Sequence, residues 1–201
     1  MLRKEKVIIL KSIKHGESDL ILHALNRQGA RVSFYAKGGA KSKKRFGGGI
    51  LEPTHYVEVS YKQKPDVVEN PLHTLLEAQL VQGFEKLRSD YDRLQAGLYF
   101  ISVTGRISQE GTIDAGDIFN LLGNALKAAE TTGDVQKLKL HFEIKLLGHH
   151  GVLPPLPGAE EWMSKPLKEH QDFDASKEDM RQLEWAVHHS LESYLSGVAP
   201  F

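Results

Sequence analysis

The strongest chemical signal in the sequence is a basic segment at residues 37–46. Five cations fall within nine positions and no acid separates them: Lys37, Lys41, Lys43, Lys44 and Arg45. Three aromatic rings lie beside or among them: Phe34, Tyr35 and Phe46. Proteins that bind single-stranded nucleic acid combine a positive groove along the backbone with aromatic side chains that stack on bases. The segment supplies both kinds of group, although a basic run of this length is also typical of a solvated charged loop.

The charge of the chain is distributed unevenly along the sequence, and this favours the nucleic-acid interpretation. Residues 1–64 hold 14 Lys and Arg against 5 Asp and Glu, a net charge of +9. Residues 65–201 hold 12 against 21, a net charge of −9. This asymmetry predicts that the first part faces a polyanion, while the second keeps the molecule soluble or meets basic partners.

Other kinds of chemistry lack the residues or the spacing they require. Cysteine is absent, which excludes disulfides and thiolate metal ligands. The histidines at 149–150 and 188–189 are adjacent, so on a helix they point roughly 100° apart, whereas helical metal ligands are three or four residues apart. Residues 39–42 lack the spacing of a phosphate-binding glycine loop, and no Gly-x-Ser-x-Gly elbow occurs. We therefore expect no catalytic residue, no cofactor, no metal and no small-molecule substrate: the protein is predicted not to be an enzyme.

The apolar run near the start of the chain is short. Residues 7–10 are Val-Ile-Ile-Leu, far fewer than a signal peptide or a membrane span needs. The sequence therefore predicts a cytoplasmic protein, associated with the nucleoid if its ligand is DNA.

The first third of the chain has the pattern of short strands separated by turns. We expect strands at 6–15, 18–26, 30–37 and 50–62, and a fifth from about 67 to 80 that is interrupted at Asn70-Pro71. Five short antiparallel strands indicate a small barrel, and the oligonucleotide-binding OB barrel has five. The basic segment, with five glycines between residues 38 and 49, is expected to be an exposed, mobile loop.

From residue 83 onward the apolar period becomes helical. A first helix is expected over 87–101, with an apolar stripe at Leu87, Tyr91, Leu94, Leu98 and Ile101. A second begins after Asp114 or Asp117, and a third spans about 135–149 with the apolar set Leu138, Phe142, Ile144, Leu146 and Leu147. Residues 152–158 are an extended connector because they are rich in proline. The last helix, near 176–195, opens with Ser176 and Asp179 as a weak capping box.

These elements predict an α+β protein of two domains. Residues 1–80 form the OB-fold, nucleic-acid-binding domain, and residues 81–201 form an all-α domain with a proline-rich excursion near 152–175. On the third helix, Lys139 and Lys145 lie close in sequence to Phe142 and Leu146. The apolar pair belongs either to the core or to a pocket rimmed by cations that could hold an acidic, hydrophobic peptide end.

Several segments resemble the bacterial recombination mediator family RecO. In the first part these are residues 7–12 (VIILKS), 15–19 (HGESD), 36–47 (AKGGAKSKKRFG) and 51–58 (LEPTHYVE). In the second part they are residues 87–91 (LRSDY), 142–147 (FEIKLL) and 151–154 (GVLP). The likeness runs in order from residue 1 to about residue 155, and the motif of the basic segment is its most specific part.

The resemblance implies an OB-fold domain that binds single- and double-stranded DNA, followed by a helical domain, with no covalent chemistry. It also implies annealing of complementary strands, binding to the acidic C-terminal tail of single-stranded DNA-binding protein, partnership with RecR and help in loading the RecA recombinase. The DNA-contacting residues carried over are Lys37, Lys41, Lys43, Lys44, Arg45 and Phe46, with Lys11, Arg31 and Tyr35 as neighbours on the barrel. The protein tail is assigned to Lys139 or Lys145 together with Phe142 or Leu146.

One feature of the sequence departs from that family. Many members carry a four-cysteine zinc module after the Leu-Pro segment, whereas residues 153–158 here continue without cysteine. We expect a metal-free excursion in its place.

Two other functions agree with the same residues. A general RNA-binding or ribosome-associated OB module would use the same loop chemistry, since cations and aromatic rings do not distinguish the two polymers. A protein adaptor that works through its acidic helical half is the third candidate. Affinities for single-stranded DNA and RNA of equal length separate the first two functions.

Overall fold

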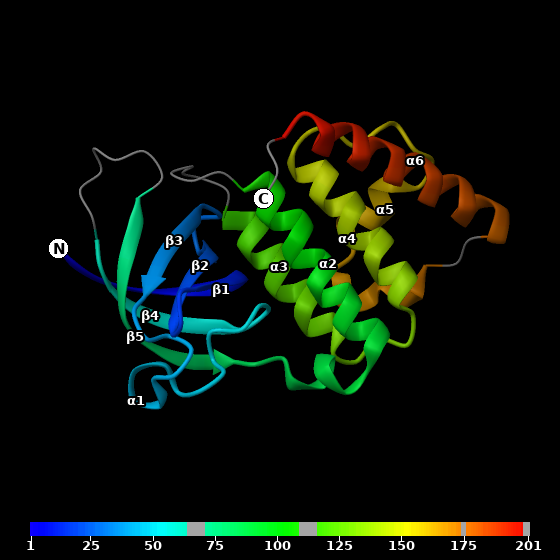
Figure 1. The fold of residues 1–201 in the computed structure, drawn as a ribbon. Coiled ribbons are helices and arrows are strands. Elements are labelled where there is room, and N and C mark those ends of the chain that lie inside the picture. The colour runs from blue at the N-terminus through cyan, green and yellow to red at the C-terminus, as the bar shows by residue number, and fades with distance from the viewer. Residues whose placement is uncertain (64–70, 109–115, 174–175, 199–201) are drawn as a thin grey trace. The chain divides into compact units, whose positions relative to one another are not determined.

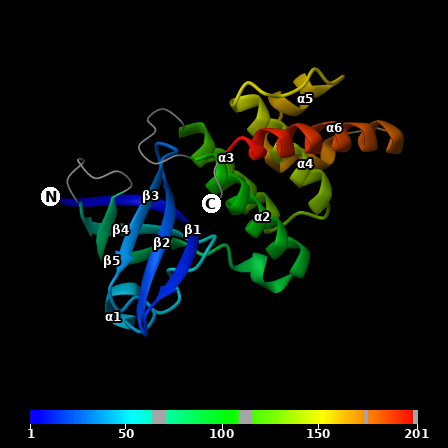
Figure 2. The ribbon, with the colours of Figure 1, turned by 45° about the horizontal axis from the view of Figure 1, so that its top comes forward.

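The computed structural model describes residues 1–63, 71–108, 116–173 and 176–198 (Figures 1 and 2). The chain forms two compact units. One comprises Met1–Phe84 and Ser108–Phe119, and the other comprises Glu85–Ile107 and Asn120–Phe201. None of the helices in the described ranges is both long enough and apolar enough to cross a membrane.

The first unit is built on a closed five-stranded barrel, as expected for an OB fold. Its strands are β1 (Leu2–His15), β2 (Asp19–Asn26), β3 (Arg31–Ala36), β4 (Tyr56–Lys62) and β5 (Leu72–Gln82). They neighbour one another in the order β1-β2-β3-β5-β4, and β4 pairs back with β1. The expectation that all strands are antiparallel was wrong for one pair, since β3 and β5 are parallel. An odd number of strands cannot close with every neighbouring pair antiparallel.

Two strand boundaries also differ from those predicted. The predicted strand at 50–62 begins only at Tyr56, because residues 50–55 form a turn in which Thr54 has a φ of 77°. The predicted start of the fifth strand near residue 67 lies outside the described residues, and β5 begins directly after Pro71.

Alternation along the strands separates the barrel core from its outer face. The buried inward residues include Val7, Ile9, Leu22, Phe34, Val57, Val59 and Leu75. The pairing of β1 with β2 shifts register between Ile9 and Lys11, so that Leu10 is the extra residue of a bulge. Residues that alternate with the inward set therefore point outward. This outer side of β1 and β2 is exposed at Ile13 but buried at Ile8 and Leu25.

The other described elements are helical. They are η1 (Glu85–Ser89), α2 (Tyr91–Ile107), α3 (Gly116–Ala129), α4 (Val135–His149), α5 (Ala159–Ser164), η2 (Leu167–Asp172) and α6 (Lys177–Ser196). The predicted cap of the last helix is confirmed, since the Asp179 backbone N–H donates to Ser176 Oγ at 3.1 Å. Of the two predicted starting residues of α3, Asp117 lies in its first turn and Asp114 lies outside the described residues.

The predicted apolar stripe of the first helix was wrong at two of its five residues. Leu87 and Ile101 are buried as predicted, but Tyr91 is 73% exposed and Leu98 is 43% exposed. The buried residues of α2 are Ala96, Gly97, Phe100, Ile101, Val103, Thr104, Gly105 and Ile107. Half of them are Ala, Gly or Thr, which a search for large apolar residues passes over. Small residues let neighbouring side chains approach the helix closely, so burial here follows packing and not hydrophobicity alone.

Helix α4 is buried over most of its circumference, so its predicted apolar set was incomplete. Leu140, His141 and Glu143 are buried together with that set. A helix with this pattern lies at the centre of a core. The ring of Phe142, for example, packs against that of Phe100 with centroids 4.6 Å apart.

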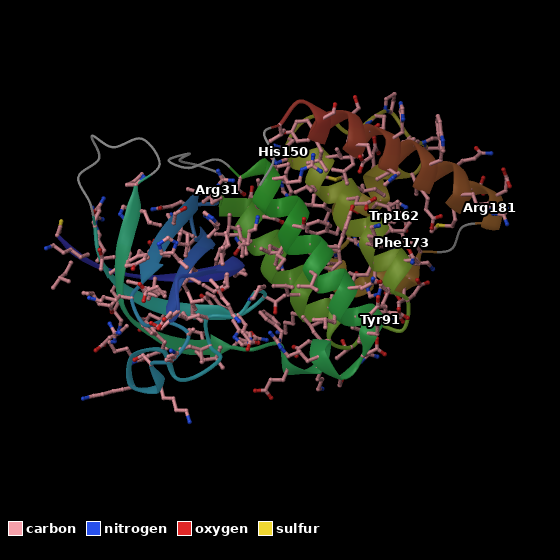
Figure 3. The ribbon with its side chains drawn as sticks, in the orientation of Figure 1. Arg31, Tyr91, His150, Trp162, Phe173 and Arg181 are labelled. Atoms are coloured by element: carbon pink, nitrogen blue, oxygen red, sulfur yellow. The ribbon has the colours of Figure 1, made fainter. Side chains whose placement is uncertain are left out.

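The excursion after α4 folds around aromatic rings. Trp162 of α5 and Phe173 stack at 3.6 Å with an interplanar angle of 6° (Figure 3). The ring of His141 meets both edge-on, and its Nε2 donates to the Trp162 carbonyl at 2.7 Å. Burial lowers the pKa of His141 to about 4, so the ring is neutral at pH 7. Within the described ranges, no three His, Asp or Glu side chains are grouped as metal ligands.

Candidate nucleic-acid interface

Three of the predicted DNA-contacting residues share the outer face of β1, β2 and β3. In the strand register, Lys11, His23 and Ser33 lie side by side across β1, β2 and β3 and form one outward row. Ile13, Ile21 and Tyr35 form the next outward row. Arg31, paired with Leu25, precedes Ser33 by two positions and so occupies the outward row on the other side. Lys11, Arg31 and Tyr35 are therefore on the same side of the sheet (Figure 3 labels Arg31). The row of Arg31 is partly covered, since its row partners Leu25 and Ile8 are buried.

Histidines that the sequence interpretation left without a role lie on this face. His23 shares a hydrogen bond with Ser33, with Nδ1 and Oγ 2.9 Å apart. The ring of His15 lies edge-on to that of Tyr35 with centroids 6.0 Å apart. The outward position of His23 was readable from the alternation of β2, in which Leu20, Leu22 and Ala24 are buried. The residues between them must then point outward.

The basic segment is ordered, which corrects the expectation of a mobile loop. Lys43–Phe46 form the short helix α1, whose N-cap Ser42 accepts a hydrogen bond from the Arg45 backbone N–H at 3.5 Å. Gly47 ends the helix with a φ of 57°, and its N–H donates to the Lys43 carbonyl at 3.0 Å. A serine before the helix and a glycine in the left-handed region after it are ordinary helix caps. The prediction of a mobile loop rested on the number of glycines and did not take these two helix caps into account.

Phe46 is in the barrel core, which corrects its assignment as a DNA contact. Its side chain is 1% exposed and packs with residues such as Phe34 and Leu51. A base can stack only on an exposed ring face. In this structure Phe46 therefore anchors the basic segment to the barrel.

Arg45 also has a structural role within the segment. Its guanidinium lies 5.0 Å from the centroid of the Phe46 ring and donates to the Lys37 carbonyl at 2.5 Å. Its Nε donates to Ser42 Oγ at 3.4 Å. These bonds fold the guanidinium back over its own segment, so Arg45 is less available to phosphates than the exposed lysines.

The other four cations of the segment face solvent. Lys37, Lys41, Lys43 and Lys44 are exposed, and none of them forms an ion pair with a residue that the structure describes. Elsewhere in the barrel Lys4 is paired with Glu58 at 2.6 Å. The four lysines thus form a positive patch that no described carboxylate neutralises, which attracts a polyanion.

The carboxylate of Asp19 lies where this patch and the outer face meet. Asp19, the first residue of β2, accepts hydrogen bonds from the Tyr35 hydroxyl and from the Gly38 backbone N–H. Those two bonds, the hydroxyl first, hold the pKa of Asp19 below its usual value. Asp19 is therefore ionised at neutral pH.

The four residues predicted to hold a peptide end do not form a pocket. Phe142 and Leu146 are buried at 0% and 1% exposure. Lys145 Nζ donates to the Met163 carbonyl at 2.6 Å, and burial lowers the pKa of this amine. Only Lys139 is near a groove, and its ammonium lies 4.1 Å from the Tyr99 ring centroid and 3.9 Å from Glu143.

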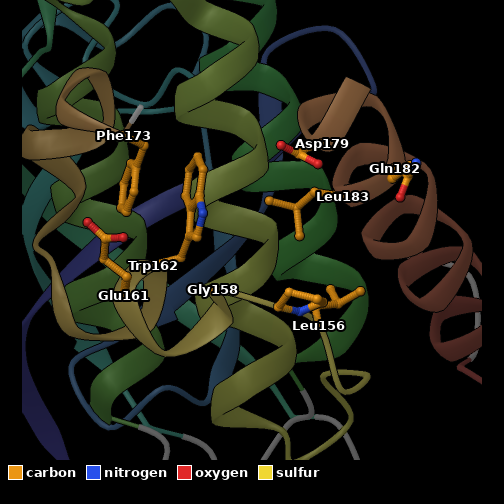
Figure 4. Close-up of a pocket in the computed structure, with 9 residues that line it drawn as sticks. Leu156, Gly158, Glu161, Trp162, Phe173, Asp179, Gln182 and Leu183 are labelled. Atoms are coloured by element: carbon orange, nitrogen blue, oxygen red, sulfur yellow. The ribbon is translucent and has the colours of Figure 1, made fainter. Parts of the chain in front are cut away.

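Three of the grooves in the helical unit are large enough for a peptide side chain. One, of about 430 Å³, has Leu156, Trp162 and Leu183 in its wall but also the acids Glu161 and Asp179 (Figure 4). A second, of about 790 Å³, has Leu98, Tyr99, Val135 and Lys139 in its wall, together with Asp92 and Asp134. An acidic peptide fits the second groove better than the first, since the second offers a cation beside an apolar surface. The third groove, of about 500 Å³, also has a cation, Arg181, beside Trp185, and this guanidinium lies 3.9 Å from Glu178.

Known proteins resemble this chain in both units. Residues 1–84 match the family model described as Recombination protein O N terminal. A DNA repair protein RecO from Rubrobacter xylanophilus is 34% identical over 162 residues, covering 80% of this chain and 62% of its own length. Proteins of the same name from Desulforamulus reducens and Alkaliphilus metalliredigens are 31% and 27% identical and cover 76% and 78% of this chain. The chain spans about three fifths of the length of these relatives.

Proposed function

We propose that the chain, whose residues 1–84 match the family model described as Recombination protein O N terminal, is a recombination mediator in DNA repair. It binds single- and double-stranded DNA and promotes annealing of complementary strands. With RecR and single-stranded DNA-binding protein, it helps to load the RecA recombinase. It works at the nucleoid in the cytoplasm and catalyses no covalent reaction.

The observation that best supports DNA binding is the positive patch of four exposed lysines beside the outer face of β1 to β3. The lysines contact phosphates, Lys11 and Arg31 extend the contact along the barrel, and Tyr35 offers its ring to a base. Phosphate contacts of this kind carry little sequence information. A mediator needs such tolerance because it must act on any strand that is being repaired.

The proposal is tested by titrating the purified chain against a fluorescein-labelled single strand of thirty deoxynucleotides at several salt concentrations. We expect submicromolar binding at low salt and a steep loss of affinity as salt rises. An RNA strand of equal length is the control: tighter binding to RNA supports the general RNA-binding module. The absence of any nucleic-acid affinity supports the protein adaptor.

Tyr35→Leu should weaken binding to the single strand by ~1–3 kcal/mol, because a stacked base loses its aromatic partner. The dependence of affinity on salt should stay the same, since no phosphate contact is removed. Tyr91→Leu is the matched control, because Tyr91 is a tyrosine of α2 with 73% exposure. Equal affinities for wild type and Tyr35→Leu would exclude stacking at this ring.

We place the acidic tail of single-stranded DNA-binding protein in the groove beside Lys139. Leu98→Glu puts a negative charge on the apolar wall of this groove. It should lower the affinity of the chain for a fluorescent peptide of the tail by about fivefold or more, roughly 1 kcal/mol. Leu80→Glu is the control, since Leu80 of β5 has the same 43% exposure as Leu98. If both variants bind the peptide like wild type, the tail does not occupy this groove.

A further inference from the structure

The carboxylate of Asp19 joins two parts of the proposed interface. Its Oδ1 accepts from the Gly38 backbone N–H at 2.7 Å, and its Oδ2 accepts from the hydroxyl of Tyr35. The next residue back, Ser18, accepts from the Ala40 backbone N–H at 2.9 Å through its carbonyl. The start of β2 thus holds the Tyr35 ring on one side and residues 38–40 on the other.

The sign of this charge is wrong for direct contact with DNA. A carboxylate near phosphates repels them, and in a surface that attracts a polyanion it should lower affinity. Both oxygens of Asp19 are used within the protein, and the chain places this acid where β2, the end of β3 and the basic segment meet. This arrangement suits a structural role, and we call the two hydrogen bonds of Asp19, to the Tyr35 hydroxyl and to the Gly38 N–H, the brace.

We propose that Asp19 is a positioning residue for nucleic-acid binding, which fixes the Tyr35 ring and the lysine-bearing segment in one geometry. The inference rests on the proposed function and names a residue on which that function depends. Lys37 and Lys41 flank the braced residues 38–40 in the chain, so an anchored backbone keeps their ammonium groups at a set spacing from the ring. A strand that stacks on Tyr35 then finds the lysines already placed, and less conformational entropy is lost on binding.

The structure explains why the neighbouring segment accepts this brace. Gly38 has a φ of 67°, in the left-handed region that glycine tolerates, and this conformation turns its N–H toward Asp19. Gly39 lies so close to Ala36 that an added Cβ would be 3.0 Å from the Ala36 carbonyl oxygen. The paired glycines therefore let the chain leave β3 tightly against the start of β2.

Three variants separate positioning from charge: Asp19→Ala, Asp19→Asn and Glu17→Ala. Asp19→Ala removes the brace and one negative charge. Asp19→Asn removes the charge but keeps an oxygen for the Gly38 N–H and an amide that can donate to the Tyr35 hydroxyl. Glu17→Ala removes an exposed acid of the same turn and is the control for charge.

If Asp19 positions the site, Asp19→Ala should bind the thirty-nucleotide single strand at least about fivefold more weakly at 0.1 M salt, equivalent to losing one phosphate contact. Asp19→Asn should bind within about twofold of wild type, and Glu17→Ala should bind equally or more tightly. Hydrogen exchange of the amides at 38–46 in the free protein should be faster in Asp19→Ala than in Asp19→Asn. Equal or tighter binding by Asp19→Ala, or unchanged exchange, overturns the proposal.

A further variant keeps the test decisive if Asp19→Ala fails to fold. Tyr35→Phe removes only the hydroxyl that donates to Asp19 and retains the ring, and it should weaken binding by about two- to fivefold. Wild-type affinity in Tyr35→Phe counts against the brace. Loss of binding by the wild type itself would instead refute the proposed function, and the two failures are thereby distinguished.

Discussion

Replacing Lys37, Lys41, Lys43 and Lys44 together by Ala should lower the salt dependence of single-strand binding by about three units of slope. Each phosphate contact contributes roughly 0.7 to the slope of log affinity against log salt on a single strand. If the two proteins bind equally at 1 M salt, the variant should be weaker by on the order of several hundredfold at 0.1 M. Arg45 is left in place because its guanidinium holds the segment together.

The control for this variant removes exposed lysines from elsewhere in the chain. Lys86, Lys127 and Lys168 are exposed and belong to the helical unit. Their joint replacement by Ala should leave the slope within about half a unit of wild type, because none contacts a phosphate in the proposed mode. Both variants should melt like wild type, since exposed substitutions usually change the free energy of unfolding by roughly 0.5 kcal/mol or less. An unchanged slope in the four-lysine variant would mean that the patch is a solvated surface and that DNA binds elsewhere.

The barrel could be predicted from the sequence because its information is local. Alternating apolar residues and short turns mark four of the strands, and β2 shows the alternation most clearly, with buried Leu20, Leu22 and Ala24. The parallel pairing of β3 with β5 has no local signal, since it joins residues about forty positions apart. It follows only from the closure of an odd-stranded barrel.

The site was predicted in part for the same reason. Charge and exposure can be read from composition, so the lysines of the basic segment were found. Whether a ring is buried depends on distant neighbours, and Phe46 was misassigned because the core cluster that contains it is drawn from all five strands. Asp19 was missed because its hydrogen-bond partners lie 16 and 19 residues further along the chain.

In the helical unit the errors came from assuming that each helix has one apolar stripe. This assumption holds for a helix at the surface of a core but not for α4, whose buried residues include His141 and Glu143. The same assumption led to the prediction of a peptide pocket formed by Phe142 with Lys139 and Lys145, whereas Phe142 is fully buried. A helix that is buried over most of its circumference, and whose buried residues include polar groups, is better interpreted as central, with internal hydrogen bonds such as that between Glu143 and Tyr99.

Phe46→Ala should destabilise the barrel by ~3–5 kcal/mol, the usual cost of removing a buried phenyl ring and leaving a cavity. The ring closes the barrel core beneath the basic segment, at 1% exposure, and it also supports the guanidinium of Arg45. Hydrogen exchange of the most protected amides of β1 and β2 should therefore become faster, by roughly tenfold for each 1.4 kcal/mol of lost stability. Trp162 and Trp185 both lie in the helical unit, so tryptophan fluorescence follows that unit separately.

The companion variant Phe46→Leu distinguishes an anchor from a stacking ring. Leucine refills most of the core volume, so its cost should be under about 1.5 kcal/mol, and DNA affinity should remain near that of wild type. A stacking role predicts the opposite ranking, because either substitution removes the ring: affinity would fall by ~1–3 kcal/mol in both, while barrel stability would hardly change. Wild-type stability in Phe46→Ala together with weakened binding would show that the ring leaves the core to meet a base. The packing of Phe46 among the inward residues of five strands makes such a rearrangement costly, since the cavity left behind has to be offset by the single stacked base.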